Sequence, residues 1–275
     1  MRKGEKKYAC AAVEVKISPP IIDKFLRVGY NRNKKKEKDK EMAKEEITLG
    51  EFEVAEDMML DGLKIVQDVR LYRFTSDSVL LSKFVTPKKG EITADFCAGS
   101  GIVGFHFFAL NRDKMKNLPV YLFELQPSLL QLAEKTAKLN GFDNFFFECG
   151  RLQEIDEKFR EKFSLVLCNP PYESGGFDNE TYEKAICRKE ITVNLKEIVD
   201  VAAFALKFGG RLALVHRADR LAEIIYTLKQ RNLETKKIQF VSGKTGAKPY
   251  LVLIEAVKGG KPSTQILPTL VNEKK

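Results

Sequence analysis

The stretch Asp95–Gly104, DFCAGSGIVG, decides the fold that this sequence predicts. It follows the apolar run Ile92–Phe96, which predicts a buried strand, and leads into an apolar helix that we expect to reach Leu110. Because glycine has no Cβ, a glycine-rich turn lets backbone N–H groups approach a ligand at the start of the helix. We therefore expect a ligand-binding loop at this turn.

Strand and helix patterns alternate along the rest of the chain. This alternation predicts a Rossmann-like α/β fold, with a doubly wound, mostly parallel sheet and an antiparallel strand near the C-terminus. The expected strands are Leu63–Val66, Ile92–Phe96, Val120–Phe123, Phe145–Phe147, Ser164–Cys168, Arg211–Val215, Thr235–Val241 and Leu251–Ala256. The expected helices, besides the one after the loop, are Ser76–Phe84, Pro127–Leu139, Leu152–Phe159, Leu195–Leu206 (ended by Gly209 and Gly210) and Leu221–Gln230.

The composition excludes several classes of protein. The 275 residues are 44% hydrophobic, which is enough for a core, and no run approaches the roughly 18 apolar residues that a membrane span needs. Five scattered cysteines and only two histidines argue against a disulfide framework, a zinc site or a histidine triad. We therefore expect a cytoplasmic protein that binds neither metal nor membrane.

The net charge of +9 is concentrated at the N-terminus. Residues 1–41 contain thirteen Lys or Arg and six Asp or Glu, and the densest part, Arg32–Lys44, has almost no apolar side chain. We interpret residues 1–45 as a flexible, lysine-rich extension and residues 46–275 as one functional domain. An RNA-binding arm is the alternative interpretation of the extension.

Two carboxylates flank the glycine loop. Asp95 ends the strand before Gly99 and Gly101, where it can serve a ligand's ammonium group. Glu124 ends the next strand, where it can accept both hydroxyls of a ribose. This pattern favours S-adenosylmethionine over NAD. The alternative is a tight structural turn with Glu124 at a solvated strand end and Cys97 serving only to pack.

The segment Leu165–Tyr172, LVLCNPPY, carries the predicted chemistry. Two consecutive prolines fix an extended chain and remove two N–H donors. The Asn169 side-chain oxygen and a proline carbonyl can then accept from an NH₂ group, which localises its lone pair for attack on a methyl donor. Tyr172 offers a face on which a flipped base can stack. The alternative is an ordinary Asn-Pro-Pro turn.

Basic residues near this segment are candidate substrate contacts. Lys184 and Arg188 follow the proline segment and can reach a phosphate. His216 and Arg217 end the strand expected at Arg211–Val215 and face the same rim. A solvated surface position is the alternative for each of them.

These motifs resemble the bacterial tRNA(Val) adenine-N6 methyltransferases, which are class I S-adenosylmethionine-dependent enzymes that modify adenine 37. The resemblance spans about residues 60–270 and rests on DGLKIVQD, RFTSDSVLLSKF, DFCAGSGIVG, FELQ, LCNPPY, LKFGGRLALVHR and VLIEAVKGGKPSTQILPTL. The catalytic residues that it implies are Asn169, Pro170, Pro171 and Tyr172. The cofactor-binding residues that it implies are Phe74, Thr75, Asp77, Asp95, Cys97, Gly99, Gly101, Glu124, Leu125, Arg151, Leu152 and Asn169.

Arg151 departs from the family pattern, which has an acidic residue at this position to accept from the cofactor's adenine amine. Arginine cannot accept a hydrogen bond, so adenine recognition must use the backbone or another group. Two alternative functions stay open: methylation of a protein glutamine amide, which also uses NPPY, and noncatalytic RNA binding on a degenerate methyltransferase fold. We expect tRNA as the partner and a monomeric protein.

Overall fold

The computed structural model describes residues 47–60, 62–71, 73–172 and 192–273. The predicted N-terminal extension, residues 1–45, lies outside this part of the chain. So do the candidate substrate contacts Lys184 and Arg188.

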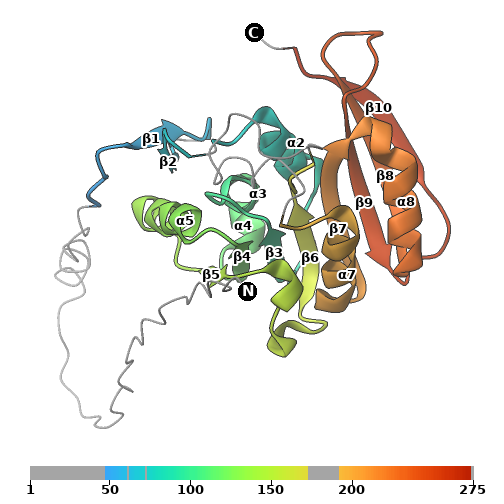
Figure 1. The fold of residues 1–275 in the computed structure, drawn as a ribbon, viewed down its shortest axis with the longest axis horizontal. Coiled ribbons are helices and arrows are strands. Elements are labelled where there is room, and N and C mark those ends of the chain that lie inside the picture. The colour runs from blue at the N-terminus through green and yellow to red at the C-terminus, as the bar shows by residue number, and fades with distance from the viewer. Residues whose placement is uncertain (1–46, 61, 72, 173–191, 274–275) are drawn as a thin grey trace, which may run out of the picture. The chain divides into compact units, whose positions relative to one another are not determined.

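An eight-stranded sheet forms the centre of the fold, in the order β10-β8-β9-β7-β6-β3-β4-β5 (Figure 1). Five neighbouring strands run parallel: β5, β4, β3, β6 and β7. β9 is antiparallel to both β7 and β8, and β10 is parallel to β8. The strand bounds are β3 Thr93–Phe96, β4 Val120–Glu124, β5 Phe145–Cys149, β6 Phe163–Cys168, β7 Leu206–Arg217, β8 Leu233–Ser242, β9 Leu251–Lys258 and β10 Gln265–Val271.

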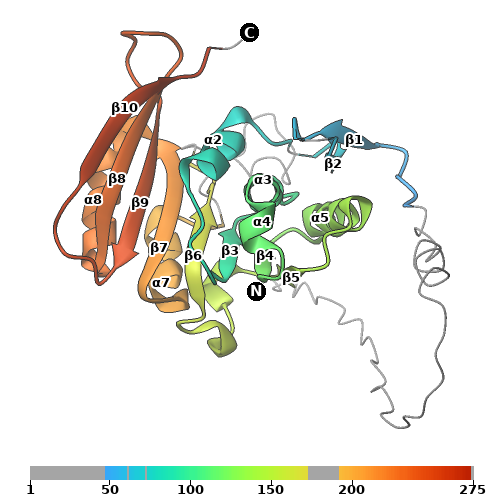
Figure 2. The ribbon, with the colours of Figure 1, turned by 180° about the vertical axis from the view of Figure 1, so that it is seen from behind.

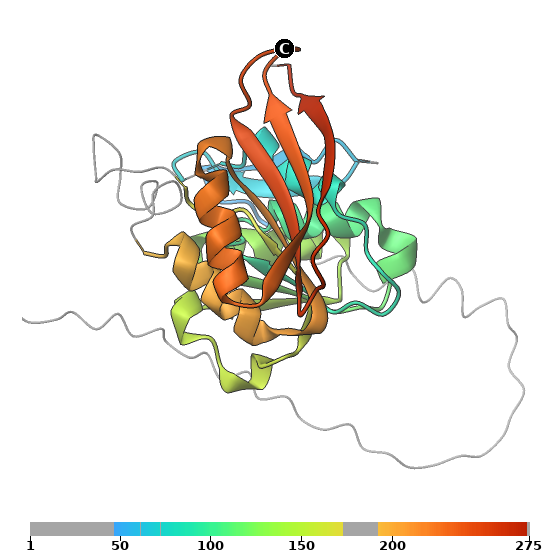
Figure 3. The ribbon, with the colours of Figure 1, turned by 90° about the vertical axis from the view of Figure 1, so that its right-hand side faces the viewer.

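Helices cover both faces of this sheet, which confirms the predicted doubly wound α/β class (Figures 2 and 3). One face carries α2 (Ser76–Phe84), α3 (Ile102–Leu110) and α5 (Pro127–Asn140), and the short α4 (Arg112–Met115) follows α3. The other face carries α7 (Leu195–Ala205) and α8 (Leu221–Gln230). Each layer is apolar because both faces of a parallel sheet are buried.

The register of the parallel strands brings their carboxyl ends together. Phe96 of β3 pairs with Phe123 of β4 on one side and with Cys168 of β6 on the other. The glycine loop, Glu124 and Asn169 therefore leave the sheet at the same edge, where open α/β sheets bind ligands.

A two-stranded hairpin precedes the sheet, formed by β1 (Glu53–Asp57) and β2 (Lys64–Asp68). β2 lies along α5, where Thr136 Oγ1 accepts from the Val66 N–H at 2.9 Å. Sequence analysis predicted β2 but missed β1, because its sequence EVAED contains a single strong strand former, Val54. It also missed β10, which contains Pro268 and is mostly exposed.

Two other expectations need correction. The helix expected at Leu152–Phe159 is replaced by two 3₁₀ turns, η1 (Leu152–Glu154) and η2 (Glu157–Phe159). Gly209 and Gly210 do not end α7, which already stops at Ala205. They lie in a bulge of β7, between its pairings with Phe163 and Leu165 of β6. A Cβ on Gly210 would lie 2.8 Å from the Lys207 carbonyl oxygen, so this bulge requires glycine there.

Gly101 is the glycine on which the loop geometry depends most. Its φ of 87° is left-handed, and a Cβ would lie 2.5 Å from the Phe105 ring and 2.9 Å from Leu122. Gly99 is also left-handed, with a φ of 58°, but it has nothing within 4 Å of the Cβ position. Alanine substitutions at Gly99 and Gly101 can therefore distinguish the cost of left-handed backbone strain from the cost of a collision with neighbouring side chains.

We predict that Gly101→Ala lowers the free energy of unfolding by about 3 kcal/mol, of which about 1–2 is left-handed strain and the rest overpacking. Gly99→Ala should lower it by only about 1 kcal/mol. Guanidinium unfolding of both variants measures the difference. Equal losses would mean that the collision at Gly101 relaxes without cost.

Candidate active site

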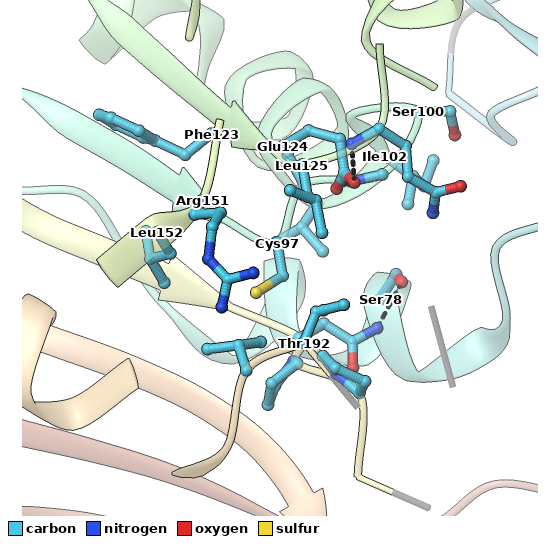
Figure 4. Close-up of a pocket in the computed structure, with 18 of the residues that line it drawn as sticks. Ser78, Cys97, Ser100, Ile102, Phe123, Glu124, Leu125, Arg151, Leu152 and Thr192 are labelled. Atoms are coloured by element: carbon cyan, nitrogen blue, oxygen red, sulfur yellow. Dashed lines mark hydrogen bonds between the residues drawn. The ribbon is translucent and has the colours of Figure 1, made fainter. Parts of the chain in front are cut away.

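A cavity opens at the carboxyl edge of β3, β4 and β6 (Figure 4). Its lining includes most of the predicted site residues. These are Phe74, Cys97, Gly99, Glu124, Leu125, Arg151, Leu152, Asn169, Pro170, Pro171 and Tyr172. Segments that are far apart in the sequence thus meet at one place, as the parallel topology predicts for the ends of β3, β4 and β6.

The loop after β3 is held by its own backbone. The Ala98 N–H donates to the Phe123 carbonyl at 3.0 Å, and the Gly101 N–H donates to the Ala98 carbonyl at 2.8 Å. Cys97 is left-handed, with a φ of 56°, which costs about 1–2 kcal/mol for a residue with a Cβ. Cys97 lines the cavity at the start of this loop.

Glu124 lies at the end of β4 against the loop. Its Oε2 accepts from the Gly99 N–H at 2.8 Å, and its Oε1 accepts from the Gln126 N–H at 2.9 Å. Burial raises the pKa of this carboxyl, and the backbone N–H groups oppose that rise. Each oxygen can accept a further hydrogen bond, so the residue fits the hydroxyls of a ribose.

Asp95 lies below the loop and does not line the cavity. It is fully buried, and its Oδ2 accepts from the Gly104 N–H of α3 at 2.8 Å. Its Oδ1 has no hydrogen-bond partner in the described part of the chain. Burial raises the pKa of Asp95 to about 8. The expected contact with a ligand's ammonium group is therefore replaced here by support of α3.

Three more predicted cofactor contacts lie outside the cavity lining. Gly101 faces the core below the loop, where Phe105 and Leu122 surround it. Thr75 is the N-cap position of α2 but makes no side-chain cap hydrogen bond. Asp77 lies on the other side of Tyr172, in a second depression.

Asn169 is oriented by a residue that sequence analysis missed. Its Nδ2 donates to the Ser78 Oγ at 2.9 Å, a bond drawn in Figure 4. Its Oδ1 is buried and has no hydrogen-bond partner among the described residues. Because Ser78 holds the amide nitrogen, the oxygen is left to accept from a ligand in the cavity that both residues line. Ser78 lies in the segment RFTSDSVLLSKF, but nothing in that pattern distinguishes it from its neighbours.

Tyr172 is held by the residue next to Ser78. Its hydroxyl donates to Asp77 Oδ2, and its ring centroid lies 5.4 Å from that of His216. Consecutive residues of α2 therefore hold both ends of the Asn-Pro-Pro-Tyr segment.

Other polar side chains support the cavity wall. Gln67 of β2 is buried, and its Oε1 accepts from the Phe74 N–H at 3.2 Å while its Nε2 donates to Ser100 Oγ. Gln153 Nε2 donates to the Thr192 carbonyl at 2.8 Å. Sequence analysis named neither glutamine, because each acts through a contact distant in the sequence.

Arg151 lines the cavity beside Leu152 and reaches toward Cys97 (Figure 4). Its Nε lies 3.7 Å from Glu154 Oε1, and its side chain is half exposed. The cavity thus presents a guanidinium at the position where the family that the sequence resembles has an acidic residue, and Gly150 lines the cavity beside it.

His216 and Arg217 differ in their surroundings. His216 is fully buried, its Nδ1 accepts from the Arg217 N–H at 2.9 Å, and burial lowers the pKa of its imidazole to about 4. His216 therefore lies as a neutral ring behind Tyr172, whereas we expected a substrate contact at the rim. Arg217 lies in the second depression and pairs with Asp219.

Comparison with known proteins identifies the family. A model described as a methyltransferase domain matches residues 87–272. The chain belongs to this methyltransferase family. Membership confirms the predictions of a methylating enzyme, of the fold class and of S-adenosylmethionine as the methyl donor. The described part of the chain contains no helix long and apolar enough to cross a membrane.

Curated relatives are distant. A tRNA1(Val) (adenine(37)-N6)-methyltransferase of Dickeya chrysanthemi is 26% identical over 192 residues, which cover 68% of this chain and 73% of that protein. A putative protein N5-glutamine methyltransferase of Methanocaldococcus jannaschii is 26% identical over 113 residues. That match covers 41% of this chain and about half, 53%, of the relative.

Solved structures share the fold. A predicted O-methyltransferase from Agrobacterium tumefaciens superposes with a TM-score of 0.56 at 20% identity and covers 71% of this chain and 86% of its own. P. horikoshii TYW2 in complex with MeSAdo superposes with a TM-score of 0.54 at 14% identity. The match covers 78% of this chain and 74% of the TYW2 chain. Both support the class I architecture.

We predict that Asp95 makes stability fall as pH rises. Its pKa is about 8 in the folded chain and near the ordinary 3.8 in the unfolded chain, so between these values only the folded state holds the proton. Each rise of one pH unit in this window therefore lowers the free energy of unfolding by about 1.4 kcal/mol. Asp95→Asn, which keeps an acceptor for Gly104, should remove a decline of about 3 kcal/mol between pH 5 and pH 7.

Denaturant unfolding at the two pH values measures this decline, with Asp143→Asn, in the exposed turn after α5, as the control. Parallel pH profiles for the wild type and Asp95→Asn would contradict the prediction.

Proposed function

We propose that this protein acts in the cytoplasm and transfers the methyl group of S-adenosylmethionine to the exocyclic N6 amine of an adenine in a tRNA. The observation that carries the proposal is the buried Asn169 Oδ1, which Ser78 leaves to accept from a ligand. Relatives named tRNA1(Val) (adenine(37)-N6)-methyltransferase match 64–70% of the chain in three bacteria. They favour adenine 37 of a valine tRNA as the target.

The residues present fit the methyl donor. The Glu124 carboxylate suits the ribose hydroxyls, and the loop at Gly99 offers its backbone beside that carboxylate. Phe74 and Leu125 supply apolar surface in the same cavity. When bound, the donor supplies an electrophilic methyl group on a sulfonium.

Asn169 and Pro170 prepare the nucleophile. The lone pair of an adenine amine is delocalised into the ring, so the amine is a weak nucleophile. Asn169 Oδ1 and the Pro170 carbonyl accept its two N–H groups and favour a pyramidal nitrogen whose lone pair points at the methyl group. Asn169 takes no proton, and the proton that N6 loses passes to water. Tyr172 stacks on the base, and Asp77 keeps its ring in place.

Methylation of a protein glutamine amide is the second candidate, because a primary amide offers the same NH₂ geometry. The relatives with glutamine methyltransferase names support it, but they match only 38–41% of the chain. Incubation with radiolabelled S-adenosylmethionine and either tRNA or release factors distinguishes the two. Label in N6-methyladenosine of wild-type tRNA, lost when adenine 37 is replaced by guanine, supports the proposal, whereas label only in protein contradicts it.

We predict that Asn169→Ala lowers kcat about 100-fold or more, because one of the two acceptors on the amine is lost. The Kd for S-adenosylmethionine, measured by calorimetry, should stay within about threefold of wild type. Asn144→Ala, at the opposite edge of the sheet where Asn144 Nδ2 donates to the Leu118 carbonyl, is the matched control and should keep kcat. Equal loss of cofactor affinity would make Asn169 a structural residue.

We predict that Ser78→Ala lowers kcat about tenfold and leaves KM for tRNA and the Kd for the cofactor unchanged, because it frees the Asn169 amide to turn. Ser82→Ala is the matched control, since Ser82 is a buried serine of the same helix that bonds to Val79 and His106 instead. It should lose comparable stability and keep kcat. A kcat loss of the same size in both variants would show a general effect of weakening α2.

A further inference from the structure

A second depression adjoins the catalytic cavity on the far side of Tyr172. Tyr172 lines both, and the second depression continues over the end of β7 and the start of β9, with Arg217, Lys248 and Tyr250 in its wall. Its volume is about 690 Å³. An open space therefore lies beside the residue proposed to stack on the target base.

Tyr250 presents a well-supported aromatic surface in this depression. Its N–H donates to the Val241 carbonyl at 2.9 Å, and its carbonyl accepts from the Ala218 N–H at 3.1 Å. Its hydroxyl accepts from Asn272 Nδ2 at 2.9 Å, while 39% of the residue stays exposed. A ring held in this way loses little conformational entropy when a base stacks on it.

The wall of this depression carries two cations, Arg217 and Lys248, and two carboxylates, Asp77 and Asp219. The two carboxylates in the wall are both engaged: Asp77 accepts from Tyr172, and Asp219 accepts from Arg217 Nε at 3.1 Å. Lys248 is exposed on the loop between β8 and β9. Its charge, after that of Arg217, also lowers the pKa of Asp219, so it lies near that carboxylate. An aromatic surface beside a cation is the usual composition of sites for single-stranded nucleic acid.

We propose that this depression binds the nucleotide next to the methylated adenine, with its base stacked on Tyr250 and its phosphate at Lys248. The inference rests on the proposed function. When the target base turns into the catalytic cavity past Tyr172, its chain neighbour is carried to the other side of that ring. The depression thereby holds the RNA strand at the flipped nucleotide without requiring a particular base, since every base has a stacking face.

The test uses the full-length protein and a valine-tRNA anticodon stem–loop. Tyr250→Ala should raise KM for this RNA about tenfold or more, within the range that one base stack contributes, and Tyr250→Phe should behave like wild type. Lys248→Ala should raise KM several-fold and reduce the salt dependence of RNA binding by about one ion. The Kd for S-adenosylmethionine should not change in any of them.

Lys116→Ala is the matched control, because Lys116 is exposed at the opposite, amino edge of the sheet. A double-mutant cycle then joins Tyr250→Ala to stem–loops with an abasic site on either side of the adenine. If the effects of Tyr250→Ala and of one of the two abasic sites on KM are not additive, the proposal is supported.

Wild-type KM in Tyr250→Ala and Lys248→Ala, or no coupling to either abasic site, overturns the inference and leaves the proposed function standing. If wild-type protein transfers no methyl group to RNA, the proposed function fails and the inference falls with it.

Discussion

The hydrogen bond from the Gly104 N–H to the buried Asp95 carboxyl group joins the end of β3 to the first turn of α3. It holds the chain between them in a tight loop, and Gly101 fits there only because it lacks a Cβ. The loop in turn places the Gly99 N–H against Glu124 at the end of the next strand. A buried carboxyl group that does not line the cavity thus determines where the Glu124 carboxyl group, which does line it, lies. Burial of Asp95 disfavours its charged form and so raises its pKa. This desolvation is the energetic cost of placing the carboxyl group there.

The helix α2 acts on the other half of the site. Asn169 and Ser78 are 91 residues apart in the sequence, yet one hydrogen bond between them determines which amide atom faces the cavity. If the Asn169 side-chain amide rotated by 180°, Nδ2 would face the substrate amine. Nδ2 is a donor and cannot accept a hydrogen bond from an N–H group. Asp77 fixes Tyr172 in the same way. The neutral, buried His216 behind that ring adds no positive charge beside the Asn169 acceptor.

Much of the fold could be predicted because its signals are local. Strands β3, β4 and β6 are short apolar runs, and α2 and α8 have the predicted bounds. Elements without such runs were missed: β1 has one strong strand former, and β10 contains a proline and pairs only along β8. The sequence of α2 predicts the helix but not which of its polar residues are buried. Ser78 and Ser82 are buried, and their hydroxyls bond to Asn169 and His106 on other elements.

The sequence by itself determined the class of fold, the loop after β3 and the residue types of the catalytic segment, since these depend on periodicity, on glycine and proline geometry and on short spacing. Only the tertiary structure decided that Asp95 supports α3, that His216 is neutral and that Ser78 orients Asn169. Burial and side-chain hydrogen bonding depend on which distant segments come into contact. No local sequence pattern specifies these contacts, because the segments come together only when β3, β4 and β6 pair in parallel register.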